Sequence, residues 1–193
     1  MSGVLASHLA AQAFWQGLVQ PRPSGAQQPL VYVSACLLGE CCRYDGGHCG
    51  QEPLRELAQR GLLLPGCPEV AGGLPVPRPP AVFQGGGGQG VLAGTARLLA
   101  RPAVTSHLAP IDHWPEVTPA FLLGARRTLD VLRAAGIQAA ILKEGSPSCG
   151  SGRITLEEQK VPGEGVTAAL LRQQGIQVFS EETLRMVWEN RKS

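Results

Sequence analysis

The sequence has little charge of either sign and no long hydrophobic run. Only 17% of its 193 residues are Asp, Glu, Lys or Arg, and the formal net charge is +2. A net charge this close to zero does not indicate the strongly basic surface of a nucleic-acid-binding protein. We therefore expect no nucleic-acid partner. No segment approaches the roughly 20 apolar residues that a membrane-spanning helix needs, so we expect no membrane partner either.

The first residues also lack the basic start and the long apolar stretch of a secretory signal, which predicts a cytoplasmic protein. Apolar residues make up 44% of the chain, enough for one substantial core. We expect an N-terminal extension and linker at residues 1–28, with an amphipathic helix at 5–19. A single α/β domain is then expected at residues 29–193.

Strand-like and helix-like segments alternate through this domain. The β-rich apolar runs that predict strands lie at residues 30–38, 62–69, 137–143 and 176–180. Helical spacing, with Pro or Gly at the boundaries, predicts helices at residues 53–61, 118–136, 163–175 and 181–192. Thr118 and Ser180 are the expected helix caps. Residues 91–100 indicate a strand or a strand pair, whereas residues 72–90 are too rich in Pro and Gly for regular structure. This order predicts a mostly parallel sheet with helices on both faces.

The chain lacks any C-x-x-C pair, although it holds six cysteines. Four of them fall within residues 36–49, a spacing that does not resemble a small secreted disulfide scaffold. Three cysteines stand near the ends of different predicted strands: Cys36, Cys67 and Cys149. Because the carboxyl ends of parallel strands meet at one edge of a sheet, we expect these three to form a site.

Three convergent thiolates predict a soft or borderline metal, chiefly zinc or an iron–sulfur cluster. A closed zinc site usually uses paired C-x-x-C units, which are missing here. A [4Fe–4S] cluster held by three cysteines would leave one iron without a protein ligand, available as a Lewis acid. Such an iron favours a sulfur-bearing substrate.

Five ordered strings resemble one family, the bacterial thiouracil desulfidases (TudS-type enzymes), formerly a domain of unknown function. They are VSACLLGE, CRYDGGH, CPEVAGGLPVPRPP, ILKEGSPSCGSGRI and GEGVTAALLRQQGIQVFSEE. The resemblance covers residues 30–183. It implies a Rossmann-like three-layer α/β domain with a [4Fe–4S] cluster on Cys36, Cys67 and Cys149 and one open iron.

The resemblance also implies roles for polar residues near these cysteines. Glu69 would act as acid and base, and Ser146 would help to place substrate or water. The expected substrate-binding residues are Ser34, Arg43, Tyr44, Asp45, Ser148, Gly165, Val166 and Thr167. Two alternatives stay open, since the loop at residues 43–48 could be only a salt-bridged turn. The glycine-rich helix start at residues 163–167 could likewise be a geometric feature and not a phosphate site.

The expected activity is a non-redox removal of sulfur from a thiolated pyrimidine, which yields the oxo base and sulfide. The substrate is a small molecule, either a free base (4-thiouracil or 2-thiouracil) or the nucleotide 4-thio-UMP. Two other classes fit the cysteines: a binding protein stapled by a metal or cluster, and a sulfur carrier that uses a cysteine persulfide. Cys41, Cys42 and Cys49 are interpreted as incidental thiols. A fourth ligand among them would close the open iron.

Overall fold

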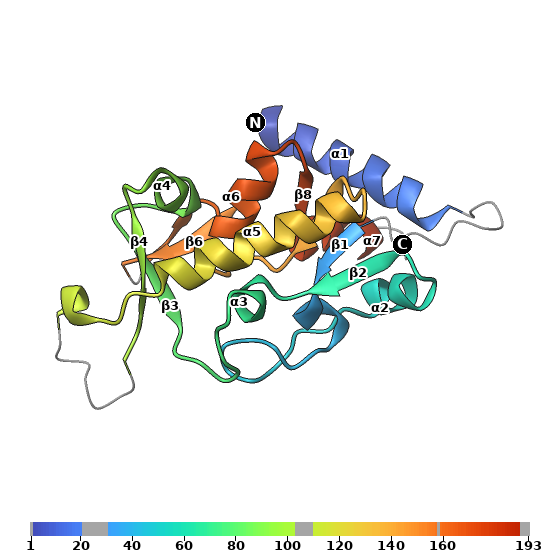
Figure 1. Ribbon diagram of the computed structural model, residues 1–193. Helices are drawn as coiled ribbons and strands as arrows, with labels where there is room; N and C mark the ends of the chain where they lie inside the picture. Colours follow the sequence, from blue (N-terminus) through green and yellow to red (C-terminus); the bar gives the residue numbers. More distant parts are fainter. Residues whose placement is uncertain (1, 21–30, 103–109, 158, 190–193) are drawn as a thin grey trace.

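The computed structural model describes residues 2–20, 31–102, 110–157 and 159–189, with side chains from residue 9 onward (Figure 1). Four parallel strands form the central sheet in the order β2-β1-β5-β8. Their bounds are β1 Val31–Ser34, β2 Leu63–Gly66, β5 Ala139–Leu142 and β8 Gln177–Ser180. All four strands were predicted, and β1 and β5 are buried throughout, as central strands covered on both faces should be.

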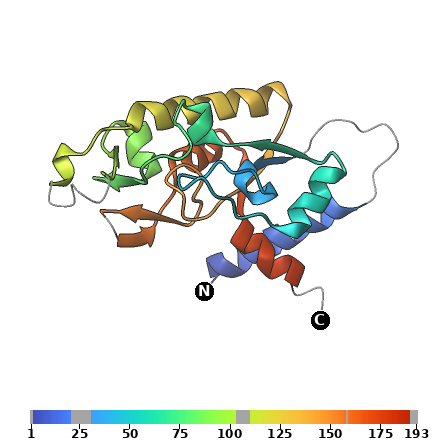
Figure 2. The same ribbon diagram turned by 90° about the horizontal axis from the view of Figure 1, so that it is seen from below.

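Helices cover both faces of this sheet, so the expected three-layer α/β architecture is confirmed (Figure 2). One face is covered by α1 Ser2–Val19, α2 Glu52–Gln59 and α7 Glu181–Glu189. The opposite face is covered by α5 Thr118–Ala134 and α6 Val166–Gln173. Successive side chains of β1 point to opposite faces of the sheet. Val33 therefore packs in the core on the first face, and Tyr32 packs in the core on the second.

Helix α1 is packed against the domain through aromatic side chains. The rings of Phe14 and Phe179 stack with their centroids 4.2 Å apart, and those of Trp15 and Trp188 lie 5.2 Å apart. Trp15 is buried in the core of that face. The predicted helix at residues 5–19 is confirmed, whereas most of the predicted linker lies outside the described residues.

A second sheet lies beyond the end of the first (Figure 1), and of its four strands only the one within residues 91–100 was predicted. Its order is β4-β3-β6-β7, and only β3 and β6 are parallel. The bounds are β3 Ala81–Gln84, β4 Arg97–Ala100, β6 Arg153–Leu156 and β7 Gln159–Pro162. It packs on α5 and on α4 Gly88–Ala93 through a core that includes the fully buried Phe83.

Several local predictions were wrong, and each has a physical reason. Residues 72–90 hold strand β3 and the start of α4, because Gly85 and Gly86 adopt positive φ and let the chain turn sharply between them. Residues 91–93 are helical and not extended. Thr118 does not cap α5; its hydroxyl instead accepts a hydrogen bond from the amide of Leu98 at 2.9 Å. Ser180 does cap α7, by accepting from the amide of Thr183 at 3.0 Å.

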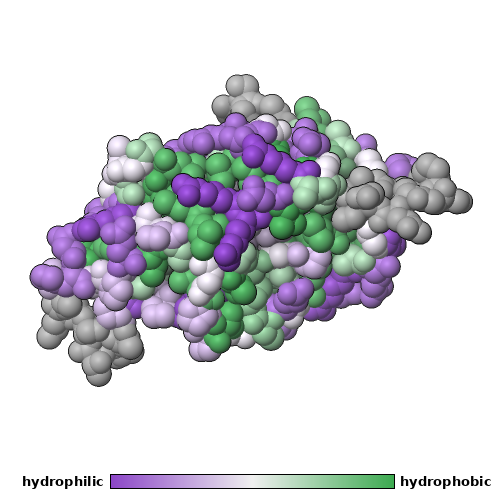
Figure 3. Space-filling view, in the orientation of Figure 1, coloured by the Kyte–Doolittle hydropathy of each residue, from purple (hydrophilic) through white to green (hydrophobic). Residues whose placement is uncertain are grey.

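The face formed by α5 carries a band of hydrophilic side chains with hydrophobic patches beside it (Figure 3). Leu123 and Val131 of α5 are among the exposed apolar residues. Within the described ranges, no helix is both long enough and apolar enough to cross a membrane.

Candidate active site

The three cysteines singled out from the sequence line one cavity of about 520 Å³. Cys36 follows β1 in the 3₁₀ turn Ala35–Leu38, Cys67 follows β2, and Cys149 lies in the loop after β5. The cavity therefore stands at the carboxyl edge of the parallel sheet, where ligands of such sheets bind. Four more predicted site residues line it: Arg43, Tyr44, Glu69 and Ser146.

Cys36 is held by a turn of the backbone that begins where β1 ends. Its carbonyl accepts hydrogen bonds from the amides of Cys49 at 3.0 Å and Gly39 at 3.3 Å. Gly39 ends the turn with φ of 103°, a conformation that other residues rarely adopt. The predicted strand thus stops four residues early, and this stop places the Cys36 thiol in the cavity wall.

Cys67 precedes the four-residue helix α3 Pro68–Ala71, which lies very close to α5. Two glycines permit this contact. A Cβ atom on Gly124 would lie 2.0 Å from the carbonyl oxygen of Pro68, and one on Gly72 would lie 2.1 Å from that of Ala120. The two backbones therefore touch directly, and α5 fixes the position of Cys67 and the neighbouring Glu69.

We expect Gly124→Ala to destabilise the protein by about 1–3 kcal/mol, because the added methyl group overlaps the backbone of α3. Thermal denaturation measures the loss, and iron binding should weaken with it because Cys67 directly precedes α3. Gly17→Ala is the matched control, since Gly17 lies in a helix with no atom within 4 Å of its added Cβ. That control should be neutral or slightly stabilising. Equal effects of the two substitutions would disprove the role given to the contact.

Cys149 is held by a loop that folds around the buried carboxylate of Glu144. Glu144 accepts hydrogen bonds from the amides of Gly145, Gly152 and Arg153 at 2.9, 3.2 and 3.0 Å, and from the hydroxyl of Ser151 at 3.0 Å. A buried carboxylate is tolerated where backbone amides satisfy it in this way. Sequence reasoning missed Glu144, which stands only five residues before Cys149.

Glu144→Gln should lower the free energy of unfolding by about 2 kcal/mol, because it removes charge-assisted hydrogen bonds. Glu144→Ala should cost about 3–5 kcal/mol, since it leaves several buried amides without an acceptor. Urea denaturation of the metal-free protein separates these values. Glu182→Gln is the control, because its ion pair with Arg153 is exposed and worth about 0–1 kcal/mol. A loss no larger than the control's would contradict the argument.

Glu69 and Ser146 meet at the cavity, although 77 positions separate them in the sequence. The Ser146 hydroxyl donates to Glu69 Oε1 at 3.1 Å and accepts from the amides of Ser148 and Cys149, each at 3.1 Å. Arg78 binds the other oxygen, Oε2, through Nε at 2.8 Å and Nη2 at 2.7 Å. One carboxylate oxygen is thus fixed by a guanidinium, and the other stays beside a hydroxyl and the Cys149 loop.

A fourth cysteine, Cys42, which the sequence analysis interpreted as incidental, also lines the cavity. The Cys42 thiol is hydrogen-bonded to those of Cys36 and Cys67, and its carbonyl accepts from Arg78 Nη2 at 3.1 Å. The bonds from Cys36 and then Cys67 lower the pKa of Cys42 to about 3, and the charge of Arg78 contributes to the same effect. Cys49 contacts Cys36 but does not line the cavity, and Cys41 is exposed.

The other thiols hold their protons more tightly. The hydrogen bond to Cys42 is the main cause that raises the pKa of both Cys36 and Cys67. Burial raises the pKa of Cys149 to about 12, although a hydrogen bond with Ser34 opposes this. Because metals bind thiolates, these three groups must release protons when a metal is bound.

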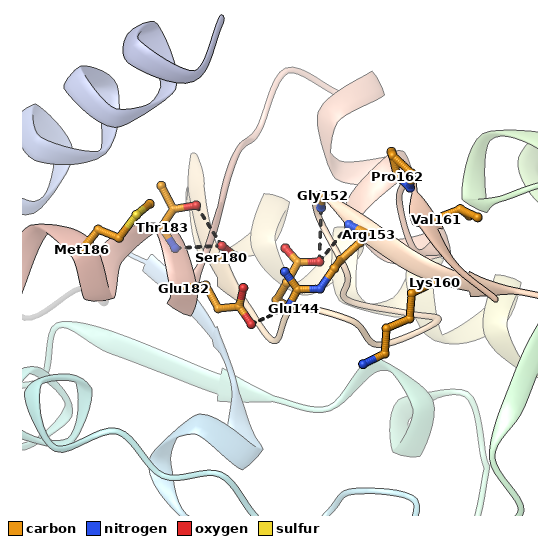
Figure 4. A pocket seen from close by; sticks show the side chains of 10 residues that line it. All are labelled: Glu144, Gly152, Arg153, Lys160, Val161, Pro162, Ser180, Glu182, Thr183 and Met186. Atoms are coloured by element: carbon orange, nitrogen blue, oxygen red, sulfur yellow. Dashed lines mark hydrogen bonds and ion pairs between the residues drawn. The ribbon is translucent and has the colours of Figure 1, made fainter. Parts of the chain in front are cut away.

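Six cationic side chains surround the cavity: Arg43, Arg78, Arg101, Lys143, Arg153 and Lys160. Arg43 is paired with Asp45 at 3.0 Å, and Lys143 is paired with the buried Glu181 at 2.8 Å. A second hollow of about 460 Å³ lies next to this cavity and shares Glu144, Arg153 and Lys160 with it (Figure 4). The surroundings of the cavity therefore suit thiolates and anions.

Several predicted substrate-binding residues are used for packing and do not line the cavity. The Ser34 hydroxyl accepts from the amide of Lys143 at 3.0 Å, and Ser148 is hydrogen-bonded to Thr167 at 2.8 Å. At the start of α6, the amides of Val166 and Thr167 donate to the carbonyls of Pro147 and Ser148. Gly165 permits this approach, since a Cβ there would lie 2.4 Å from the Ser148 oxygen. These amides are therefore occupied and offer no phosphate site.

The loop at residues 43–48 matches the salt-bridged-turn alternative in part. Asp45 pairs with Arg43 and does not line the cavity.

The donor set at the cavity fits an iron–sulfur cluster. Soft thiol ligands from three separate elements line a single cavity, and uncharged hydroxyls and cations surround them. Among the described residues, no three His, Cys, Asp or Glu side chains converge closely enough to hold a single metal ion.

The matches to known proteins cover most of the α/β domain that holds the cavity. A family model described as 2-thiouracil desulfurase matches residues 31–183. The chain belongs to the 2-thiouracil desulfurase family. Within this family match lie all four strands of the central sheet, the cavity-lining cysteines and Glu69, whereas α1 precedes it.

Two similar proteins accompany the family match. The uncharacterized protein YbbK of Bacillus subtilis (strain 168) is 41% identical over 158 residues, which cover 80% of this chain and 97% of YbbK. The solved structure of the [4Fe-4S]-dependent thiouracil desulfidase TudS (DUF523Vcz) is 42% identical and superposes with a TM-score of 0.66. That match covers 86% of this chain and 99% of the TudS chain.

Proposed function

We propose that this protein is a [4Fe–4S]-dependent desulfidase that removes sulfur from thiolated pyrimidines, namely 4-thiouracil, 2-thiouracil or 4-thio-UMP. Family membership and the similarity to TudS support the reaction class. The observation that carries the proposal for this chain is the cavity itself. Three thiols from three strand ends line it together with Glu69 and Ser146.

Cys36, Cys67 and Cys149 would hold the cluster, as the soft ligands that line the cavity at the ends of three different strands. The group they hold would supply a Lewis-acidic iron without a protein ligand, able to draw electron density from a thiocarbonyl sulfur. The cations around the cavity would stabilise the negative charge of the thiolates and of an anionic substrate.

Glu69 would act as the general base. Its Oε2 is fixed by Arg78, and its Oε1 is oriented by the Ser146 hydroxyl but can accept a second hydrogen bond, from a water. Glu69 takes a proton from this water as the oxygen attacks the ring carbon that bears the sulfur. The C–S bond then breaks, and the sulfur leaves as sulfide. One water is consumed, one sulfide is released, and no electron is gained or lost.

An anaerobic assay with reconstituted protein tests this proposal. Each of the three substrates is added separately, and both the loss of thiocarbonyl absorbance and the release of sulfide are followed. We expect one equivalent of sulfide for each thiocarbonyl lost, without any added reductant or oxidant. If none of the three substrates loses sulfur while four irons are bound, the proposal is wrong.

The same preparation separates the two other classes. A colourless protein with one zinc would indicate a stapled binding protein. Activity without iron, dependent on a single cysteine, would indicate a persulfide carrier.

We place the desulfidase in the cytoplasm, where a reducing environment keeps six cysteines free of disulfides.

A further inference from the structure

We propose that the ring of Tyr44 stacks on the pyrimidine ring of the substrate, so that the cavity selects flat aromatic rings. This inference rests on the proposed function, because it concerns how the same cavity holds its substrate. It names a feature that is recognised separately from the sulfur, namely the planarity of the ring.

Tyr44 gives the cavity an aromatic surface that no other described residue provides. Its side chain lines the cavity and is 43% exposed. Apart from the cysteines, the other apolar residues of the described wall are aliphatic or proline: Pro80, Ala81, Val82, Pro147 and Ile154. Bases bind to proteins in large part by stacking on aromatic side chains, so Tyr44 is the residue of this wall that suits a pyrimidine.

The ring of Tyr44 is held in place by its own loop. The Arg43 guanidinium carbon lies 5.9 Å from the ring centroid, within the range of a cation–π contact, and Arg43 is itself paired with Asp45 at 3.0 Å. With the guanidinium over one face of the ring, the opposite face is the one on which a ligand can stack. The amide of Arg43 donates to the Gly47 carbonyl at 3.3 Å, and that of Gly46 donates to the Arg43 carbonyl at 3.0 Å. A loop closed in this way lowers the entropy that is lost when a ligand binds.

The same loop is tied to the proposed general base. The Tyr44 carbonyl accepts a hydrogen bond from the Arg78 amide at 2.8 Å, and the Arg78 guanidinium binds Glu69 Oε2 at 2.7 and 2.8 Å. Arg78 therefore fixes both the backbone of Tyr44 and the carboxylate of Glu69. A pyrimidine stacked on Tyr44 would be held in a set position relative to the base, as the attack of water on one ring carbon requires.

Two rings without sulfur test the inference, by isothermal titration calorimetry with the reconstituted protein. Uracil is flat, whereas 5,6-dihydrouracil keeps the same carbonyl and N–H groups on a puckered ring without a continuous π-face. The wild-type protein should bind uracil roughly fivefold or more tightly than dihydrouracil, because stacking favours uracil alone. Tyr44→Leu should lose this preference, and Tyr44→Phe should keep it.

Leu123→Ala is the matched control for the binding measurement. Leu123 is similarly exposed, at 41%, but it lies on α5 and does not line the cavity. This variant should bind both rings as the wild-type protein does. Circular dichroism of each variant shows that a changed affinity does not reflect a loss of folding.

Steady-state kinetics give a second readout. Tyr44→Leu should raise the KM for 4-thiouracil by about 5- to 100-fold, the range expected for loss of one stacking contact. The kcat should stay nearly unchanged, since the ring is stacked both in the bound substrate and in the transition state.

Three results would overturn the inference. Equal affinity of the wild-type protein for uracil and dihydrouracil, or no measurable binding of uracil, would mean that the cavity does not recognise a flat ring. An equal loss in Tyr44→Phe and Tyr44→Leu would mean that the hydroxyl binds the ligand and that the ring does not stack. Because neither test ring carries sulfur, the binding result is independent of the sulfide-release assay that decides the proposed function.

Discussion

Replacing Cys36, Cys67 or Cys149 by alanine, one at a time, should abolish both cluster binding and desulfidase activity. Two remaining thiolates do not hold a four-iron cube, because a cluster site needs its ligands to be positioned together by the fold. Iron content, the broad absorbance near ~400 nm and sulfide release should all fall to the background. We expect this to be the largest effect of any single substitution in the chain.

Cys41→Ala is the control for this series, since Cys41 is exposed and does not line the cavity. It should keep full iron content and activity. The metal-free variants should retain the circular dichroism spectrum of the metal-free parent, because alanine is only slightly smaller than cysteine. Four irons and normal turnover in any of the three variants would remove that cysteine from the proposed ligand set.

Glu69→Gln should lower kcat by about 10²–10⁴-fold and leave the iron content unchanged, since an amide cannot take the proton of the attacking water. The substitution keeps the shape of the side chain and an acceptor for Arg78. The measurement is steady-state sulfide release at saturating substrate, together with an iron assay. Glu52→Gln is the control, because Glu52 forms an exposed ion pair with Arg55 on α2.

The kinetic pattern separates proton transfer from binding. A higher KM with unchanged kcat would mean that Glu69 only binds the substrate. Loss of iron from Glu69→Gln would mean that the pair with Arg78 stabilises the cluster site and that the carboxylate is not the base.

The central sheet and its cysteines could be predicted from the sequence because both depend on local pattern. Apolar runs gave β1, β2, β5 and β8, and parallel strands bring their carboxyl ends together whatever the loops do. Cys36 and Cys67 directly follow strands β1 and β2, and Cys149 lies in the loop after β5, so the edge at which they meet could be predicted, although the packing of the Cys149 loop on Glu144 could not.

Strands β3, β6 and β7 of the second sheet could not be predicted, because none of them stands in a long apolar run like those that indicate β1 and β5. Phe83 of β3 pairs with Leu156 of β6, and β3 stands in a segment of Pro and Gly that locally disfavours any strand. Tertiary contacts decide such elements. The helix α4 was missed because a run of four glycines, residues 85–88, leads into its start and locally disfavours a helix.

The polar framework of the site also depends on tertiary structure. The ion pair of Arg78 with Glu69 crosses nine residues of Pro-rich chain, and no spacing rule indicates it. Cys42 lacks a local signal as well, because only the fold brings it against Cys36 and Cys67. The start of α6 looked like an anion site in the sequence, yet the Cys149 loop uses its amides. A partner 19 residues away cannot be read from the motif itself.

An iron anomalous difference map of anaerobically grown crystals tests the central claim most directly. Our account predicts one compact four-iron peak in the cavity, bonded to the sulfur atoms of Cys36, Cys67 and Cys149, with the fourth iron bonded to none of these three. A single-ion peak, or a cluster that lies away from any one of these cysteines, would contradict it.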